Sequence, residues 1–196
     1  MFIDTTAENA AEGALADWYQ SQRKSWGFLP EYAGCFSSRP EVAKAWSGLN
    51  LAIRGGMDRR RYELATIAAA RALRSTYCTA AHASFLRDVC GDAQTVEALA
   101  LAPDGSTLSD VDAAVYTFAT KVAVDAAAVE QSDVDTLRAA GLSDADVTDV
   151  VLAVGARAFF ATVLDGLGAR LDPQTAASFE PDVLQSMVVG RPVGEA

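Results

Sequence analysis

The residues of this chain best suited to chemistry are a cysteine and a histidine one helical turn apart. His82 is the single histidine and follows Cys78 by four residues, so on a helix the two side chains share a face. At that spacing the imidazole can accept or share the thiol proton. Cys78 also lies three residues after Ser75, the predicted cap of this helix, and the N–H groups of a first helical turn stabilise a thiolate. Cys78 is therefore a candidate nucleophile, with His82 as a candidate partner for its proton.

Basic residues and one carboxylate precede this pair. Arg54 to Arg74 is the most basic stretch of the chain, and we expect its charge to favour the thiolate further. Its arginines are Arg54, Arg59, Arg60, Arg61, Arg71 and Arg74. Glu63 comes fifteen residues before Cys78 and meets the pair only if the chain turns near Ser75. There Glu63 would orient His82 or accept its proton.

Other interpretations of these residues stay open. A buried cysteine is often a small hydrophobic residue, and a lone histidine is often a satisfied core residue. Cys78, His82 and Glu63 are also ligand types that zinc accepts, but no further cysteine or histidine completes the set, and we predict neither a metal nor a cofactor. The large aromatic residues are expected in the core or at an interface. These are Trp18, Trp26, Trp46, Phe159 and Phe160.

The composition narrows the class of protein. The chain has 196 residues, 51% of them hydrophobic, which is enough for the core of a single domain. Its formal net charge of -10 argues against binding to nucleic acid or to an anionic membrane surface. The most apolar stretch, residues 147–169, carries Asp149, Arg157 and Asp165, which are costly inside a membrane. The N-terminus does not resemble a signal peptide, so we expect a cytoplasmic protein with reduced cysteines.

Helical patterns extend along almost the whole chain and predict an all-α fold. The expected helices are residues 10–22, 40–54, 58–74, 75–90, 92–100, 109–129, 132–140 and 143–167. Gly and Pro separate them, and Asp58, Ser75 and Ser143 are the expected caps. We predict one domain over residues 1–196, with a motif core at 49–91, a second helical unit at 109–168 and a less regular tail at 173–196.

A weak internal repeat links the two helical units. The residues Asp58, Glu63, Arg71 and Ala72 recur in kind 86 residues later as Asp144, Asp149, Arg157 and Ala158. The second segment has Ala161, Leu164 and Gly168 where the first has Ser75, Cys78 and His82. Two similar helical units packed together would account for the repeat, as would the shared alanine-rich composition. On either explanation we expect any polar chemistry to belong to the first segment.

The segment ELATIAAARALRSTYCTAAH, residues 63–82, resembles the core motif of the carboxymuconolactone decarboxylase/AhpD-like superfamily. That motif is a glutamate, eleven residues, a cysteine, two residues, a second cysteine, three residues and a histidine. Glu63, Cys78 and His82 match three of its positions, and Ser75 stands at the first cysteine. The resemblance implies an all-helical fold that assembles as trimers or hexamers. Some members reduce hydroperoxides through a cysteine pair with a Glu/His proton relay, and others are decarboxylases without cysteines.

On this resemblance, Cys78 is the peroxide-reacting thiol, His82 its proton partner and Glu63 the relay carboxylate. Ser75 cannot form the local disulfide that resolves an oxidised Cys78. An external thiol, or a distant Cys90 or Cys35, would have to do so, or the peroxidase activity is lost. Our leading hypothesis is a homo-oligomeric hydroperoxidase with a small-molecule hydroperoxide substrate and a thiol reductant. The alternatives are a decarboxylase or lactone-type enzyme, in which His82, Glu63 and Arg71 handle an anionic substrate, and a non-catalytic family member.

Overall fold

A computed structural model describes residues 1–195, and over these residues the chain is helical without any β-strand. The all-α prediction is therefore confirmed. Short 3₁₀ turns occur at Glu8–Ala10, Glu31–Phe36 and Ala126–Ala128. The α-helices are α1 (Gly13–Trp26), α2 (Pro40–Gly56), α3 (Arg59–Ala72), α4 (Thr76–Asp88), α5 (Ala93–Leu101), α6 (Asp110–Asp125), α7 (Gln131–Ala139), α8 (Asp144–Leu167), α9 (Pro173–Ala176) and α10 (Pro181–Met187).

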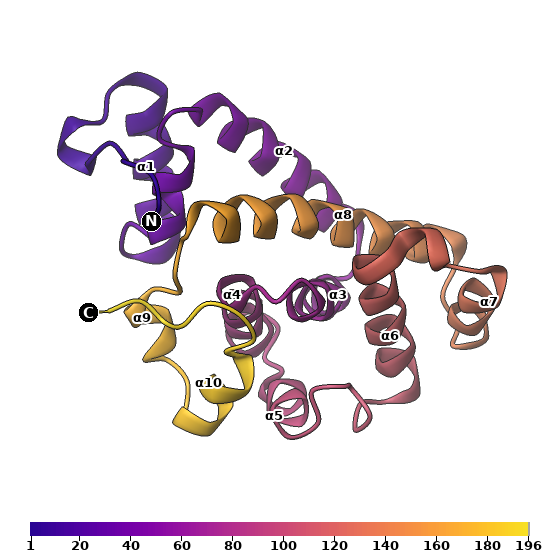
Figure 1. Cartoon of the computed structure of the whole chain (residues 1–196). Helices are drawn as coiled ribbons and strands as arrows, with labels where there is room; N and C mark the ends of the chain where they lie inside the picture. The colour runs from indigo at the N-terminus through magenta and orange to yellow at the C-terminus, as the bar shows by residue number, and fades with distance from the viewer. Residues whose placement is uncertain (196) are drawn as a thin grey trace.

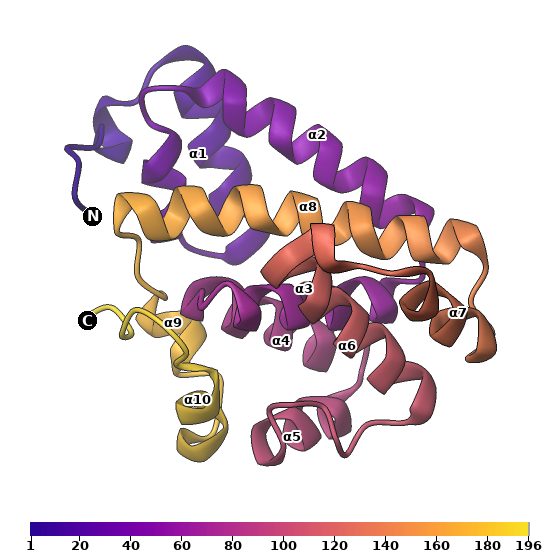
Figure 2. The same cartoon turned by 45° about the vertical axis from the view of Figure 1, so that its right-hand side comes forward.

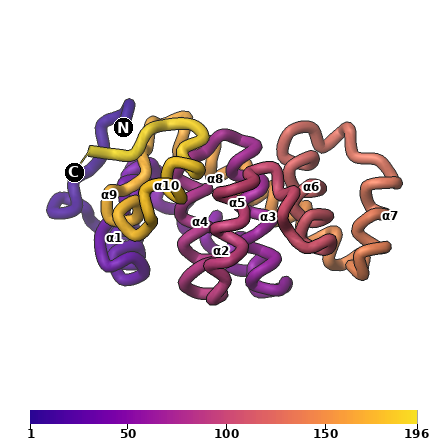
Figure 3. Tube along the Cα trace, turned by 90° about the horizontal axis from the view of Figure 1, so that it is seen from below, coloured from indigo at the N-terminus to yellow at the C-terminus, as the bar shows by residue number. Residues whose placement is uncertain are grey.

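The long helix α8 crosses the middle of the molecule, with α2 on one side and α3 and α4 on the other (Figures 1 and 2). Helix α3 packs against α4, α6 and α8. Seen from below, α1, α9 and α10 gather at the end that holds both termini, and α6 and α7 form the opposite end (Figure 3). Helix α8 is long and apolar enough to cross a membrane, but α2, α3 and α6 pack around it, as around a core helix.

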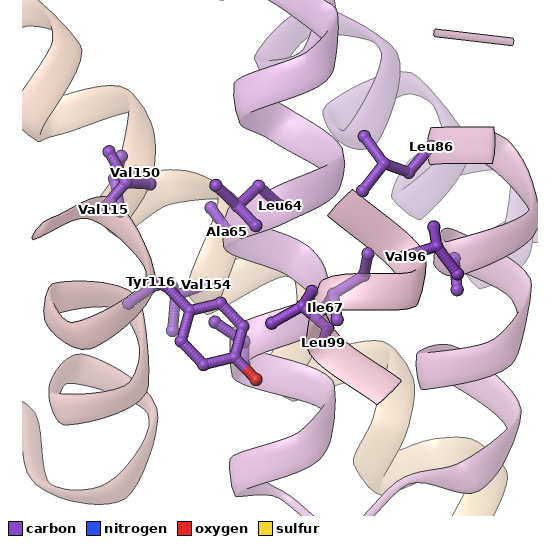
Figure 4. Close-up of a cluster of buried hydrophobic side chains, with 14 of the residues drawn as sticks. Leu64, Ala65, Ile67, Leu86, Val96, Leu99, Val115, Tyr116, Val150 and Val154 are labelled. Carbon is purple, nitrogen blue, oxygen red and sulfur yellow. The ribbon is translucent and has the colours of Figure 1, made fainter. Parts of the chain in front are cut away.

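The largest apolar cluster joins the inner faces of α3, α4, α5, α6 and α8, with further side chains from α7, α9 and α10. Figure 4 shows Leu64 and Ile67 of α3 among the side chains that α4, α5, α6 and α8 contribute. The labelled partners are Leu86, Val96, Leu99, Val115, Tyr116, Val150 and Val154. A second cluster holds aromatic residues of α1, the Glu31–Phe36 turn and α8. Helix α3 contributes to both clusters, so burial of apolar surface on two sides holds this helix in place.

Side-chain caps begin several of these helices where the sequence predicts them. Asp58 accepts a hydrogen bond from the Arg61 backbone N–H at 2.8 Å, and Ser143 forms a capping box with Asp146. Ser75 occupies the cap position of α4, but its side chain makes no capping bond. Arg74 adopts a left-handed conformation with φ 58° just before it. The chain therefore turns at this point, and α3 and α4 pack against each other.

The C-terminal tail packs on the turn between α3 and α4. The Gly190 N–H donates to Thr76 Oγ1 at 2.9 Å, and Arg71 donates to the Ser186 carbonyl at 3.0 Å. Arg74 donates to the Val189 carbonyl at 3.3 Å. The tail is less regular than the rest of the chain: two short helices are separated and followed by non-helical segments, and the tail contacts the segment that carries Ser75.

Gly190→Ala is expected to lower the free energy of unfolding by about 2 kcal/mol. A Cβ at this position would overlap the Arg74 carbonyl oxygen, which belongs to the backbone and cannot move aside cheaply. Gly48→Ala is the matched control, because a Cβ there meets no neighbouring atom and alanine suits the interior of α2. Urea unfolding of both variants tests the prediction, and equal stability of the two would contradict it.

Candidate functional site

A cavity of about 350 Å³ opens among α1, α2, α3, α4 and α8, and three of the four predicted site residues line it. They are Glu63 from α3 and Cys78 and His82 from α4. Ser75 is buried but is not among the lining residues. This size is near the lower end of the range for small-molecule sites. The three motif residues that match the family pattern therefore share one cavity.

Glu63 and His82 form a buried pair across the contact between α3 and α4. Glu63 Oε2 lies 2.5 Å from His82 Nδ1, and Glu63 Oε1 accepts from Arg59 Nε at 2.5 Å. Both carboxylate oxygens are thus engaged. The turn at Ser75 brings these residues together, as the prediction required. Glu63 therefore orients His82, and Arg59 offsets part of the cost of burying the carboxylate.

The charge states of this pair follow from its surroundings. Burial and the nearby Arg157 guanidinium lower the pKa of His82 to about 4, against the opposing effect of Glu63. Burial raises the pKa of Glu63, but His82 and Arg59 outweigh this effect, and the net change is a lowering. At neutral pH the site thus holds a carboxylate and a neutral imidazole. Nδ1–H donates to Glu63, which leaves Nε2 as the basic nitrogen.

The Cys78 thiol faces an arginine of α8. Arg157 Nη1 donates to Cys78 Sγ at 3.5 Å, and both residues are almost fully buried. Burial lowers the pKa of Arg157, but Cys78 and Tyr62 raise it by more. The guanidinium also lies 5.3 Å from the centre of the Phe160 ring. Arg157 is therefore a buried cation beside the candidate nucleophile.

Two expectations about this thiol need correction. Cys78 and His82 line the same cavity, but residues 1–195 show no hydrogen bond between them. The charge beside Cys78 comes from Arg157 and not from the basic stretch before it. Four arginines of that stretch bond elsewhere: Arg60 with Asp92 and Asp112, Arg61 with Asp146, and Arg71 and Arg74 with tail carbonyls. Closeness in sequence did not predict which arginine lies beside Cys78, because the direction of each side chain is set by its position on its helix or turn.

Arg157 is the site residue that the sequence analysis missed. The expectation that polar chemistry belongs to the first segment alone is wrong, because Arg157 lies on the second. Two signals pointed to it: its place in the internal repeat and its positive charge, the only one in α8. Its counterpart Arg71 lies outside the cavity and holds the tail. Helix α8 also runs unbroken through Ala161, where the first segment turns at Ser75.

Ser75 lies on the α8 side of the turn, near Asp165. Its Oγ is buried without a hydrogen-bond partner in the described residues, as is Asp165 Oδ2. Burial raises the pKa of Asp165, and the smaller effects of the nearby Ser75 and Arg191 oppose it. The other two cysteines have weakly acidic thiols: burial and Glu31 raise the pKa of Cys35 to about 12, and burial and Glu63 raise the pKa of Cys90.

The aromatic residues divide between core and cavity. Trp18 is buried in the core and Phe159 is 42% exposed. Phe160 belongs to the second apolar cluster, against which Trp26 and Trp46 pack, and all three also line the cavity. Trp46 stacks on Phe160 with ring centres 4.0 Å apart. Among residues 1–195, no group of three or more His, Cys, Asp or Glu is arranged to hold a metal ion.

Comparisons with known proteins identify the fold that carries this site. Residues 40–104 match the model of the Carboxymuconolactone decarboxylase family, and this segment contains Glu63, Ser75, Cys78 and His82. A peroxidase-related protein from Ralstonia eutropha, described as an alkylhydroperoxidase AhpD core, superposes with a TM-score of 0.77 and 19% identity, covering 97% of both chains. The chain has an AhpD-like fold. No curated protein sequence matches it significantly.

Two further solved structures share this AhpD-like fold. A peroxidase-related protein from a Silicibacter species has a TM-score of 0.77 and 18% identity, covering 89% of this chain and 93% of its own. The debrominase Bmp8, a cysteine-to-alanine variant in complex with 2,3,4-tribromopyrrole, has a TM-score of 0.76 and 14% identity, covering 95% and 97%. At these identities the likeness establishes the fold, and the chemistry has to be argued from the site.

Proposed function

We propose that this AhpD-like protein is a thiol-dependent hydroperoxidase in which Cys78 is the reacting thiol. The observation that carries the proposal is the arrangement of two side-chain pairs, each with one charged member, on one cavity. Cys78 faces the Arg157 guanidinium, and neutral His82 faces the Glu63 carboxylate. The fold shared with peroxidase-related proteins supports the same class of reaction.

In the oxidation step, the thiol proton passes to His82 Nε2, directly or through a bound molecule. The transfer generates a thiolate beside Arg157 and an imidazolium beside Glu63, so each new charge faces an opposite charge already in place. The sulfur attacks the terminal, hydrogen-bearing oxygen of the hydroperoxide, an S–O bond forms and the O–O bond breaks. The imidazolium returns its proton to the leaving alkoxide. One thiol and one hydroperoxide thus yield a sulfenic acid and an alcohol.

An external thiol completes the proposed cycle. A first thiol condenses with the Cys78 sulfenic acid and releases water, which leaves a mixed disulfide. A second thiol attacks that disulfide, restores Cys78 and leaves as the oxidised reductant. Ser75 has no sulfur and cannot supply the internal disulfide. The raised pKa of Cys35 and of Cys90 disfavours either thiol as a rapid internal substitute.

Exposure of the reduced protein to tert-butyl hydroperoxide with the sulfenate trap dimedone tests this proposal. We expect one adduct, on Cys78, and at least about a hundredfold slower consumption of hydroperoxide in Cys78→Ser. Cys90→Ser is the matched control and should react like the original protein. Peptide mass spectrometry identifies the labelled residue. Equal consumption of hydroperoxide by Cys78→Ser, or labelling spread over all three cysteines, would rule the proposal out.

A second candidate function is a decarboxylase or lactone-type reaction on a small anionic substrate. The observation that favours it is Arg157, a buried guanidinium whose Nε has no partner in the described residues. Arg157 takes the place that the sequence analysis gave to Arg71, with His82 and Glu63 as the proton-transfer pair. Activity retained in Cys78→Ser but lost in His82→Ala would identify this second function.

A further inference from the structure

The cavity is positively charged although the protein carries a formal net charge of -10. Glu63 is its one carboxylate among the described lining residues, and both of its oxygens are already bound, by Arg59 and His82. Two guanidinium groups, Arg54 and Arg157, also line the cavity. No lining carboxylate is left to accept hydrogen bonds from either of them. An anion entering the cavity would therefore find unpaired donors.

Arg54 is the nearer of these two groups to solvent. It lies half-buried on α2, while Arg157 lies at the buried end beside Cys78. In residues 1–195, every arginine side chain except Arg54 and Arg170 donates a hydrogen bond or forms an ion pair. Arg170 is exposed and outside the cavity. A half-buried arginine without a partner, on the wall of a cavity, is suited to hold a ligand anion.

The apolar walls of the cavity come from aromatic pairs on four helices. Trp46 of α2 stacks on Phe160 of α8, with ring centres 4.0 Å apart. The ring centres of Trp26 of α1 and Phe85 of α4 lie 5.2 Å apart. Such walls favour a flat ring, which stacks on or meets the edges of aromatic side chains. A volume of about 350 Å³ suits a compact ligand with one ring better than a long acyl chain.

We propose that this cavity selects single-ring aromatic compounds that carry a carboxylate, with the anion bound by Arg54 and the opposite end of the ring directed at Cys78. The ligand class follows from the cavity itself. Its consequence for catalysis rests on the proposed function, and makes the preferred substrate a benzylic hydroperoxide with a carboxylate on the far side of the ring. Arg157 remains free to stabilise the sulfur during the reaction.

Binding of unreactive probes tests the ligand class without any turnover. The probes are 4-isopropylbenzoate, its uncharged analogue 4-isopropylbenzamide and the linear anion octanoate, each titrated calorimetrically into the reduced protein. We expect the benzoate to bind at least about tenfold more tightly than either of the others, because it alone offers both a ring and an anion. Equal affinity for benzoate and benzamide, or tighter binding of octanoate, would overturn the proposal.

Arg54→Gln and its matched control distinguish a direct contact between Arg54 and the ligand anion from a general effect of the protein's charge. In Arg54→Gln we expect the preference for benzoate over benzamide to disappear, while the benzamide affinity stays the same. Arg170→Gln removes the other unpartnered arginine and the same unit of charge, and it should keep the full preference. A preference that survives in Arg54→Gln, or is lost equally in both variants, would show that Arg54 is not the anion site.

Cumene hydroperoxide and its para-carboxylate then connect the ligand to the reaction. We expect the carboxylate to oxidise Cys78 at least about tenfold faster at low concentration, and Arg54→Gln to remove that advantage. Oxidation of Cys78 by both compounds at one rate would refute the substrate preference and leave the hydroperoxidase proposal intact. Selective benzoate binding without oxidation of Cys78 would support the ligand class and refute the hydroperoxidase.

Discussion

Replacing Arg157 with methionine is expected to slow the oxidation of Cys78 by about a hundredfold, the loss typical of removing one preorganised charge-stabilising donor. Arg157 Nη1 donates to Cys78 Sγ, and among residues 1–195 no other cation donates a hydrogen bond to this sulfur. Without Arg157, the thiolate would form in a buried site with no opposite charge beside it. Stopped-flow oxidation by tert-butyl hydroperoxide and alkylation by iodoacetamide both measure the effect.

The stability of Arg157→Met should not fall with the reactivity of its Cys78. Arg157 is buried without a carboxylate partner, and replacing a buried charge with an apolar side chain of similar length is often neutral or stabilising. We therefore expect Arg157→Met to unfold at an equal or higher urea concentration. Arg71→Met is the matched control, because it removes the counterpart arginine that holds the Ser186 carbonyl. That control should lose stability and keep the reactivity of Cys78.

The outcome that contradicts the role of Arg157 is a folded Arg157→Met whose Cys78 reacts at the original rate. Arg157→Lys provides a second comparison if the methionine variant is poorly folded. It keeps the positive charge but loses the planar, several-donor geometry of the guanidinium. An intermediate rate in Arg157→Lys would mean that both the charge and the guanidinium geometry contribute, whereas equal rates in the lysine variant and the original protein would assign the effect to charge alone.

Acidification from pH 6.5 to pH 4 is expected to destabilise the protein through His82 by up to about 3 kcal/mol. The pKa of His82 is about 4 in the folded protein, against 6.5 for the ordinary side chain. As the pH falls through this window the unfolded chain binds a proton and the folded chain does not, so the unfolded state gains stability. Above pH 6.5 neither state is protonated and the effect is absent. Urea unfolding at intervals between pH 7.5 and pH 4.5 measures it.

His82→Gln isolates this effect because the chain has no other histidine. Glutamine can still donate to Glu63 but does not titrate, so the destabilisation between pH 6.5 and pH 4.5 should largely disappear. Glu63 has a lowered pKa, and the stability that it contributes is lost only below its ordinary value of 4.5. Burial raises the pKa of Asp165 and of Asp172, which acts in the opposite direction in both proteins. Identical pH profiles for the two proteins would refute the buried, neutral His82.

Local sequence patterns were sufficient for the helices and for part of the site. Asp58 and Ser143 mark the starts of helices because each side-chain oxygen accepts a hydrogen bond from the free backbone N–H three residues later, which is a local interaction. The four-residue spacing of Cys78 and His82 places them on one face of α4 for the same local reason. The meeting of Glu63 with His82 needed one further condition, a turn near Ser75, which Arg74 and Ser75 provide.

The sequence by itself determined the all-α fold, the helix that carries Cys78 and His82, and the carboxylate that reaches His82. Only the tertiary structure decided that Arg157, 79 residues from Cys78, is the cation beside the thiol. It likewise decided that His82 is neutral and that Trp26, Trp46 and Phe160 line the cavity. The physical reason is that these properties depend on which side chains lose water when α8 packs across α2 and α3. Charge and hydrophobicity along the chain do not specify that packing.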